Sequence, residues 1–179
     1  MASEILNLDA HTIYVGDDDP TNTLLLRIKS TKLPELEEVT KEHLGGGAMA
    51  QLVIGMRAFK MSPFTFKLEG YNPEIDRRFM PITPRRIKYT VRGNITNLRT
   101  HAETELKIII EGRMTKMTKS ELERDKSVES DYEINEIVWL EEFHGGVEKK
   151  FFDYWAGPAG LRIEGQPVAP TLARNLGVA

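Results

Sequence analysis

Cysteine is absent from all 179 residues, which excludes a disulfide framework, a thiolate-bound zinc or iron–sulfur site and a cysteine nucleophile. Neither sign of charge is in large excess, since the sequence has 24 basic and 27 acidic residues. The formal net charge of -3 argues against a dedicated polycationic nucleic-acid binder. No apolar run approaches the roughly 20 residues of a membrane helix, and the first nine residues lack the pattern of a signal peptide. We therefore expect a soluble, unanchored protein that is made in the cytoplasm.

Long stretches of helical periodicity are also missing, and the dominant pattern is period-two alternation of apolar and polar residues. It is clearest where Phe64, Phe66 and Leu68 alternate with polar neighbours, as in a half-buried strand. Similar alternation predicts strands over residues 24–28, 52–59, 87–91, 105–117, 134–143 and 161–164. The fold class predicted is mostly β, a sandwich or barrel with one or two short helices, because the long crossover helices of parallel sheets are absent.

Two short helices and one domain complete the predicted organisation. Asn72, Pro73 and Glu74 form a helix start, and the helix is expected to end near residue 80 before Pro81. A second short helix is predicted at about residues 167–176, with Gly177 as its C-cap. The mixed-charge run over residues 119–133 predicts a surface loop. The length predicts a single domain over residues 1–179.

An exposed arm is predicted at about residues 33–50. Residues 35–44 are charged and lack strong apolar periodicity, and three consecutive glycines, Gly45, Gly46 and Gly47, follow them. Because glycine has the freest backbone, the triplet is interpreted as a hinge in this arm.

No motif predicts catalysis, a cofactor or a metal site. The run Asp17-Asp18-Asp19 lacks the later ligands of a calcium loop, and the glycine triplet lacks the Lys-Ser/Thr pair of a phosphate loop. Adjacent Glu141 and Glu142 point to opposite faces of a strand, which is unsuited to paired acid–base work. The histidines are scattered without metal-ligand spacing: His11, His43, His101 and His144. No catalytic, cofactor-binding or metal-binding residue is therefore predicted.

Several motifs, taken in order, resemble the phage major tail tube proteins of contractile tails and R-type bacteriocins. They lie at residues 33–36, 45–49, 64–74, 89–93, 111–115, 161–165 and 172–177, so the resemblance covers roughly residues 5–178. It implies a β-sandwich-like subunit whose inner barrel is completed by hexamerisation, with rings stacking into the inner tube. It also implies location in the virion tail, assembly in the host cytoplasm, and neither catalysis nor a cofactor.

The resemblance implies a set of partners. These are further copies of the chain, the tail sheath protein, the tape-measure protein, and the baseplate and tail terminator proteins, with DNA passing through the lumen without specific binding. A tube protein of a contractile injection system or bacteriocin that carries no DNA is the alternative. A stand-alone β-barrel binding module is a third hypothesis.

If the chain is a tail tube protein, its arm and the polar faces of its strands are expected to have specific roles. The arm is expected to make contacts between subunits and between stacked rings through Leu33, Pro34, Leu36, Glu38, Gly45, Gly46, Gly47 and Met49. Alternation of the strands makes the polar side chains lumen candidates, namely Thr65, Lys67, Glu69, Lys107, Glu111, Arg113 and Thr115. Because DNA must slide without sticking, the basic strand Arg85–Arg92 is predicted to face outward or into a subunit interface.

Overall fold

The computed structural model describes residues 5–16, 23–47, 49–79, 82, 85–122, 124–125 and 127–178. The run Asp17-Asp18-Asp19 lies outside these residues. The described strands are β1 (Leu6–Val15), β2 (Ile28–Lys32), β3 (Leu36–His43), β4 (Leu52–Met61), β5 (Phe64–Glu69), β6 (Ile87–Asn97), β7 (Glu103–Lys119), β8 (Glu129–His144), β9 (Val147–Asp153), β10 (Leu161–Ile163) and β11 (Gln166–Pro167). The helices are α1 (Pro73–Asp76), the 3-10 helix η2 (Tyr154–Ala159) and α2 (Pro170–Asn175).

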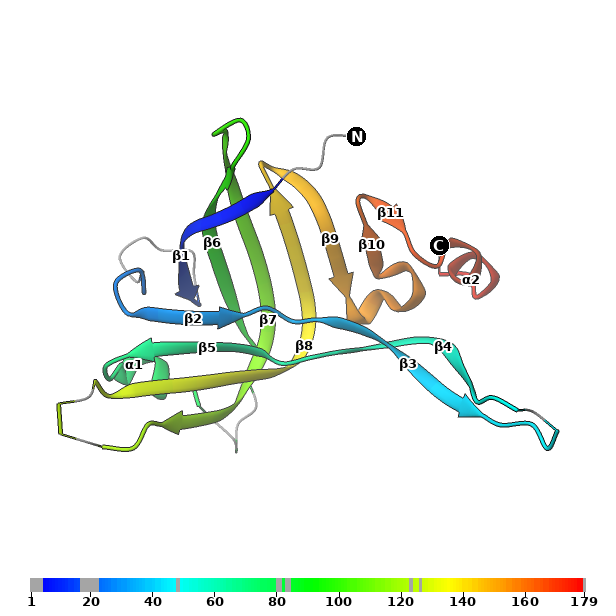
Figure 1. Cartoon of the computed structure of the whole chain (residues 1–179), viewed down its shortest axis with the longest axis horizontal. Coiled ribbons are helices and arrows are strands. Elements are labelled where there is room, and N and C mark those ends of the chain that lie inside the picture. The colour runs from blue at the N-terminus through cyan, green and yellow to red at the C-terminus, as the bar shows by residue number, and fades with distance from the viewer. Residues whose placement is uncertain are drawn as a thin grey trace.

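The mostly-β fold predicted from alternation is confirmed. One antiparallel sheet follows the order β1-β6-β7-β8-β9-β10-β11, with β5 attached to β8 and β2 attached to β5. Strands β3 and β4 form a separate two-stranded sheet (Figure 1). Among the described strands the sheet does not close into a barrel.

The long hairpin of β7 and β8 bends in its middle and changes partners there. Its pairing shifts register between Glu111 and Arg113 and again between Met114 and Lys116, and Glu136 has a φ of 50°. Such bulges bend and twist a strand. On one side of the bend the hairpin lies between β6 and β9, and on the other side β5 pairs with β8.

The bend divides the sheet into two halves that pack on one another. We call β1, β6, β9 and the adjoining parts of β7 and β8 the β1 half, and β2, β5 and the remaining parts of β7 and β8 the β5 half. Strands of the two halves run in crossed directions (Figure 1), as in orthogonal packings where bent strands pass between layers.

The core lies between the two halves. Phe64 and Phe66 of β5 meet Tyr89 of β6 with ring centroids 5.9 and 6.2 Å apart. Phe66 also stacks on Tyr132 of β8 at 5.0 Å. Aliphatic side chains of the remaining strands fill the rest of the core, including Ile13, Val15, Val91, Ile108, Ile110, Met114 and Ile134.

Several predicted boundaries are wrong, each for a local reason. Residues 24–27 form a turn in which the Leu24 carbonyl accepts from the Arg27 and Ile28 N–H groups, so β2 begins only at Ile28. Helix α1 starts as predicted, with the Asn72 side chain accepting from the Glu74 N–H, but ends at Asp76. Strand β8 begins at Glu129 inside the predicted loop, because Ser130 and Tyr132 are buried while their charged neighbours face outward.

The end of the chain also differs in detail from the prediction. Helix α2 begins at Pro170, because Gln166 and Pro167 pair with β10 as strand β11. Gly177 follows the helix with a φ of 69° and donates its N–H to the Arg174 carbonyl, which is the predicted capping position.

Replacing Phe66 by alanine should destabilise the protein strongly. Its side chain is 2% exposed and contacts aromatic rings of both halves, so Phe66→Ala should lower the free energy of unfolding by about 3–5 kcal/mol. Phe59→Ala is the matched control, since that ring is 38% exposed and should cost less. Chemical denaturation of both variants checks this, and equal losses would contradict a core centred on β5.

Candidate functional site

The predicted arm is one strand of a hairpin that projects from the body (Figure 1). Its strand β3 pairs with β4, and the glycine triplet lies in the loop at the far end. At the base, Glu35 and Ser62 exchange hydrogen bonds of 2.9 and 2.8 Å, and Phe59 packs edge-on against Phe152 at 5.4 Å. The glycines predicted to be a hinge in the arm thus lie at its far end and not at its base. They connect its two strands.

One face of the outer part of this hairpin combines four exposed apolar side chains with Lys41 and His43. Ile54 lies opposite Lys41 and Leu52 lies opposite His43, so these side chains share a face with Val39 and Met56. All four apolar side chains are at least 39% exposed. A two-stranded hairpin is marginally stable alone in water, and this one offers apolar surface that its own body does not cover.

A bulge near the middle sets the local shape of the hairpin. The pairing shifts between Glu38 and Thr40, and Arg57 has a φ of 54°. The Arg57 N–H donates to the Glu38 carboxylate at 3.1 Å. A Cβ at position 55 would lie 2.4 Å from the same carboxylate, so any larger residue there would displace the end of the Glu38 side chain.

The outer face of the β5 half carries three of the lumen candidates, Thr65, Lys67 and Glu69. Lys67 lies 3.2 Å from the Glu129 carboxylate and 3.4 Å from Asp131. Charges of both signs are interspersed on this face, which carries Lys29, Lys32, Lys67 and Lys116 beside Glu69, Glu129, Asp131 and Glu133. The face therefore carries many individual charges, but the numbers of its lysines and carboxylates are equal.

Ion pairing on this face shifts the pKa values of its members. Hydrogen bonds from Lys29 and then Lys67 hold the pKa of the Glu129 carboxyl below its ordinary value. The hydrogen bond to Glu129 and the charge of Asp131 raise the pKa of Lys67. Both groups therefore remain charged at neutral pH.

The other lumen candidates do not belong to that face. Lys107 and Glu111 lie on the outer face of the β1 half, where Glu111 is opposite Lys88 and Lys107 is opposite Arg92. A lumen lined by Lys107 and Glu111 would therefore also be lined by two residues of the basic strand, so the two sequence predictions conflict. Residues Arg113 and Thr115 lie at the bend, bound to Glu136 and Asn135, respectively.

The basic strand is engaged in contacts of its own. Arg86 lies 3.9 Å from Glu136 and 5.6 Å above the ring of Trp155 in η2. Arg92 lies 2.7 Å from Glu105 on the neighbouring strand. These contacts spread the positive charge among acidic and aromatic partners.

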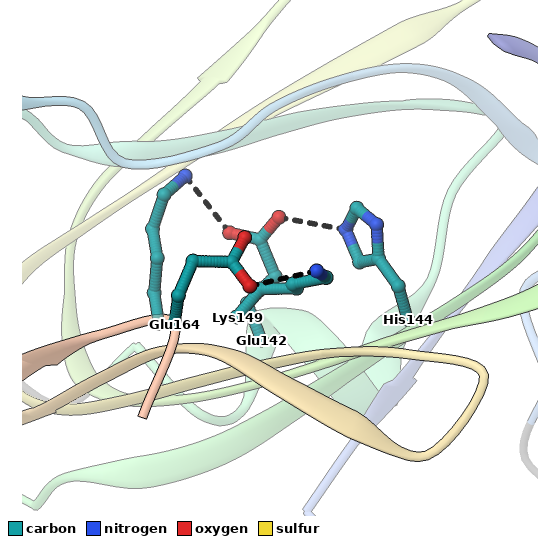
Figure 2. Close-up of polar contacts among 5 residues, drawn as sticks. Glu142, His144, Lys149 and Glu164 are labelled. Carbon is teal, nitrogen blue, oxygen red and sulfur yellow. Dashed lines mark hydrogen bonds and ion pairs between the residues drawn. The ribbon is translucent and has the colours of Figure 1, made fainter. Parts of the chain in front are cut away.

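A polar cluster on β8 and β9 was not anticipated from sequence (Figure 2). Glu142 accepts from His144 at 2.9 Å and from Lys150 at 3.0 Å, and Lys149 binds Glu164 at 2.8 Å. Sequence reasoning compared Glu142 only with adjacent Glu141, whereas residues two apart share a strand face. The Glu142 group and the Lys149–Glu164 pair are two separate sets of compensated surface charges.

The described residues carry neither a metal-binding cluster nor a membrane-spanning helix. They contain no group of three or more His, Cys, Asp or Glu side chains placed to hold a metal ion. No helix among them has the length and apolar character needed to cross a membrane. His11 is half-buried and bound to the Thr31 hydroxyl at 2.9 Å, and burial lowers the pKa of its imidazole.

The chain is similar to a known protein family and to a solved structure. The family described as phage tail tube protein FII matches residues 10–159. Among solved structures, a chain of the anti-feeding prophage baseplate, determined by cryo-EM with six-fold symmetrisation, matches with a TM-score of 0.50 and 9% identity. The match covers 80% of this chain and 95% of that one. No curated protein matches the sequence.

The family match, together with the open sheet and its projecting hairpin, defines the class as a tail tube structural protein. The chain belongs to the phage tail tube protein FII family, as the match over residues 10–159 shows. The resemblance noted from sequence is thereby confirmed, and the protein is a structural component of a phage-type tail.

Substitution of Gly55 should disturb the hairpin without unfolding the body. In Gly55→Ala the new Cβ displaces the Glu38 carboxylate and removes its bond to the Arg57 N–H. We expect faster hydrogen exchange at Arg57, with the global free energy of unfolding changed by less than about 0.5 kcal/mol. Gly46→Ala is the control, because no atom lies within 4 Å of its added Cβ. Unchanged Arg57 exchange would contradict the described bulge.

Removing Lys29 should raise the pKa of Glu129. In the native protein the lowered pKa means that the stabilisation by Glu129 is present above its ordinary pKa and is lost as pH falls through the lowered value. NMR titration of Lys29→Gln should show Glu129 titrating closer to 4.5, with a smaller acid-induced loss of stability. Lys60→Gln, which removes the partner of Glu37, should leave Glu129 unchanged.

Proposed function

We propose that this chain is the major tail tube subunit of a contractile tail. In this proposal six copies form a ring, rings stack into the inner tube, and DNA passes through the bore during ejection. The sheath protein surrounds the tube, the tape-measure protein occupies it during assembly, and baseplate and terminator proteins bind its ends. The observation that carries the proposal is the family match over most of the chain. The six-fold symmetrisation of the matched baseplate structure supports the choice of six copies.

The β3–β4 hairpin is proposed to join successive rings. It projects beyond the body and presents Val39, Leu52, Ile54 and Met56 to solvent. Burying such side chains against a second copy would gain roughly 25 cal/mol per Å² of apolar surface. Strand pairing along the hairpin would add backbone hydrogen bonds.

The outer face of the β5 half is proposed as the lumen wall. Its lysines and carboxylates balance, so it lacks the uniform positive charge that would hold DNA phosphates. Thr65, Lys67 and Glu69 remain lumen residues in this proposal. Lys107 and Glu111 are assigned instead, with Lys88 and Arg92, to the surface of the β1 half.

A tube that carries no DNA is the second candidate. The matched structure is that of an anti-feeding prophage baseplate, and its fold is shared over most of this chain. The same ring and the same stacking contacts would serve both tubes, so the candidates differ in cargo.

Negative-stain microscopy of the purified protein, with its mass in solution, tests the proposal. Hollow tubes or rings with six-fold averages are expected, alone or after addition of baseplate or tube ends as nuclei. A protein that stays monomeric in the presence of those nuclei would refute it. DNA inside tubes isolated from intact particles would select the phage candidate, and DNA-free particles the other.

Stacking should depend on the hairpin face that carries the four apolar side chains. Ile54→Lys replaces an apolar side chain at the centre of that face by a second lysine opposite Lys41 and should give single rings in place of tubes, since burying an additional unpaired charge is costly. Glu42→Lys changes the opposite face at a comparable distance from the tip and is the control. Electron microscopy counts rings and tubes, and tubes of normal length from Ile54→Lys would contradict the assignment.

A further inference from the structure

Strand β2 is fastened to strand β1 of the other half near both of its ends. Before β2 begins, the Leu24 N–H donates to the Ile13 carbonyl at 3.3 Å. Near the end of β2, the Thr31 hydroxyl lies 2.9 Å from Nε2 of His11. The first fastening contains no ionisable group. The second contains a histidine, the side chain whose charge ordinarily changes between about pH 5 and pH 8.

His11 lies on the face of β1 that turns toward the core. It continues the alternation of the buried residues Ile13 and Val15 on the same strand. On β6 it is opposite Gly93, which in turn is opposite buried Leu106 of β7. Because glycine has no side chain, the neighbouring position on β6 offers the imidazole no polar partner. His11 is therefore half-buried at the rim of the core.

The charged side chains of the strands around His11 point to the outer faces of the two halves. The bulge in β1 turns Asp9 outward, where Asn94 and Thr96 donate hydrogen bonds to its carboxylate. The other charged residues of this kind are Lys29 and Lys32 on β2, Lys67 on β5, Arg92 on β6, and Glu105 and Lys107 on β7. Beyond β2, the exposed side chain of Glu35 pairs with Lys32 at 3.4 Å. The core face around His11 is thus formed by uncharged residues of β1, β2, β6 and β7.

A second histidine on the same core face has a carboxylate partner. His144 of β8 is opposite Leu106, and its Nε2 lies 2.9 Å from Glu142, which also binds Lys150 at 3.0 Å (Figure 2). A proton gained by His144 is therefore compensated by the adjacent carboxylate. The hydrogen-bond partner of His11 is instead a neutral hydroxyl, which leaves a gained charge uncompensated.

We propose that His11 is a pH-dependent fastening, which holds the end of β2 against β1 while the imidazole is neutral and releases it when the imidazole is protonated. The protonated ring can still donate a hydrogen bond to Thr31. However, a charge that stays half-buried without an ionic partner loses much of its solvation. Movement of the ring into water restores that solvation and separates Thr31 from β1. The fastening belongs to the single chain and does not require the proposed ring.

The segment after β2 connects this fastening to the root of the hairpin. Residues 33–35 lie between the end of β2 and the start of β3. Leu33 packs against the core, and Glu35 exchanges hydrogen bonds with Ser62 at the base of the hairpin. Because the segment is short and attached at both ends, release of Thr31 should loosen Leu33 and the first turn of chain into the hairpin.

The direction of the pH effect follows from the burial of the imidazole. Burial lowers the pKa of His11 below its ordinary value of 6.5. The stabilisation of the closed form is therefore fully present above pH 6.5 and is lost as the pH falls through the lowered pKa. The fastening is closed at neutral pH and opens in acid.

Amide hydrogen exchange of the wild-type chain tests the fastening without any substitution. Protection factors, which are corrected for the intrinsic exchange rate at each pH, report local opening. Those of the protected amides of β2 should fall at least about threefold between about pH 8 and pH 5. Those of Ile108 and Ile110 in the core should stay constant. An NMR titration of the His11 imidazole in the same samples should give a pKa below 6.5.

The variant His11→Gln separates the charge from the hydrogen bond. Glutamine can place its amide near the Thr31 hydroxyl but gains no proton, so the protection of β2 should be the same at both pH values. His144→Gln and His43→Gln are the matched controls, and both should keep the wild-type fall. An equal fall in His11→Gln would overturn the proposal. A wild-type imidazole of His11 that titrates at 6.5 or above would also overturn it, whether or not the variant folds.

A consequence for assembly rests on the proposed function, in which the hairpin joins successive rings. Wild-type protein supplied with tube ends as nuclei should form shorter tubes at about pH 5 than at about pH 8, and His11→Gln should form tubes of equal length at both. Equal wild-type lengths, with β2 released in the exchange experiment, would overturn this consequence alone. Absence of rings and tubes at both pH values would refute the proposed function. The fastening itself is then decided by the exchange and titration results.

Discussion

The bend in the β7–β8 hairpin is the constraint on which the rest of the structure depends. Two strands of 17 and 16 residues cross from one half of the sheet to the other, and the register shifts near Arg113 allow them to turn. If the hairpin were straight, the two halves of the sheet could not pack on one another. Phe64 and Phe66 would then lose their ring contacts with Tyr89. Bending thus creates the core from a single sheet. It also ends the contact with β6 at Gly112 and so exposes the last part of β7.

Exposed edges and an uncovered hairpin are liabilities in a monomer. Natural proteins usually blunt such edges, and here the lysines of β2 are neutralised by ion pairs with Glu129 and Glu35. A chain without cysteine has no covalent way to secure its contacts, so an assembly must accumulate many weak ones. In the proposed tube, strand pairing between subunits would supply many hydrogen bonds and fix the relative orientation of neighbours.

The sequence predicted the interior of the fold better than its exterior. Core residues such as Phe64, Phe66 and Leu68 repeat with period two, so their strand and its buried face could be predicted from local pattern. The start of β8 was missed, since Glu129 and Asp131 look like loop residues until their outward direction is known. Alternation also could not distinguish the two outer faces. That difference depends on the bend, which brings Thr65 and Lys107 to opposite sides of the core through pairings distant in sequence.

Balanced charge on the proposed lumen wall has a physical advantage over a neutral polar surface. Lys67 already lies between Glu129 and Asp131, so a passing phosphate must compete with two carboxylates for its ammonium group. Binding of DNA by lysine gains free energy from released counterions, and a lysine neutralised by the wall itself releases none. The carboxylates at the same time repel phosphates along the whole face. Paired charges therefore keep the wall hydrated while removing the electrostatic term that would hold DNA in place.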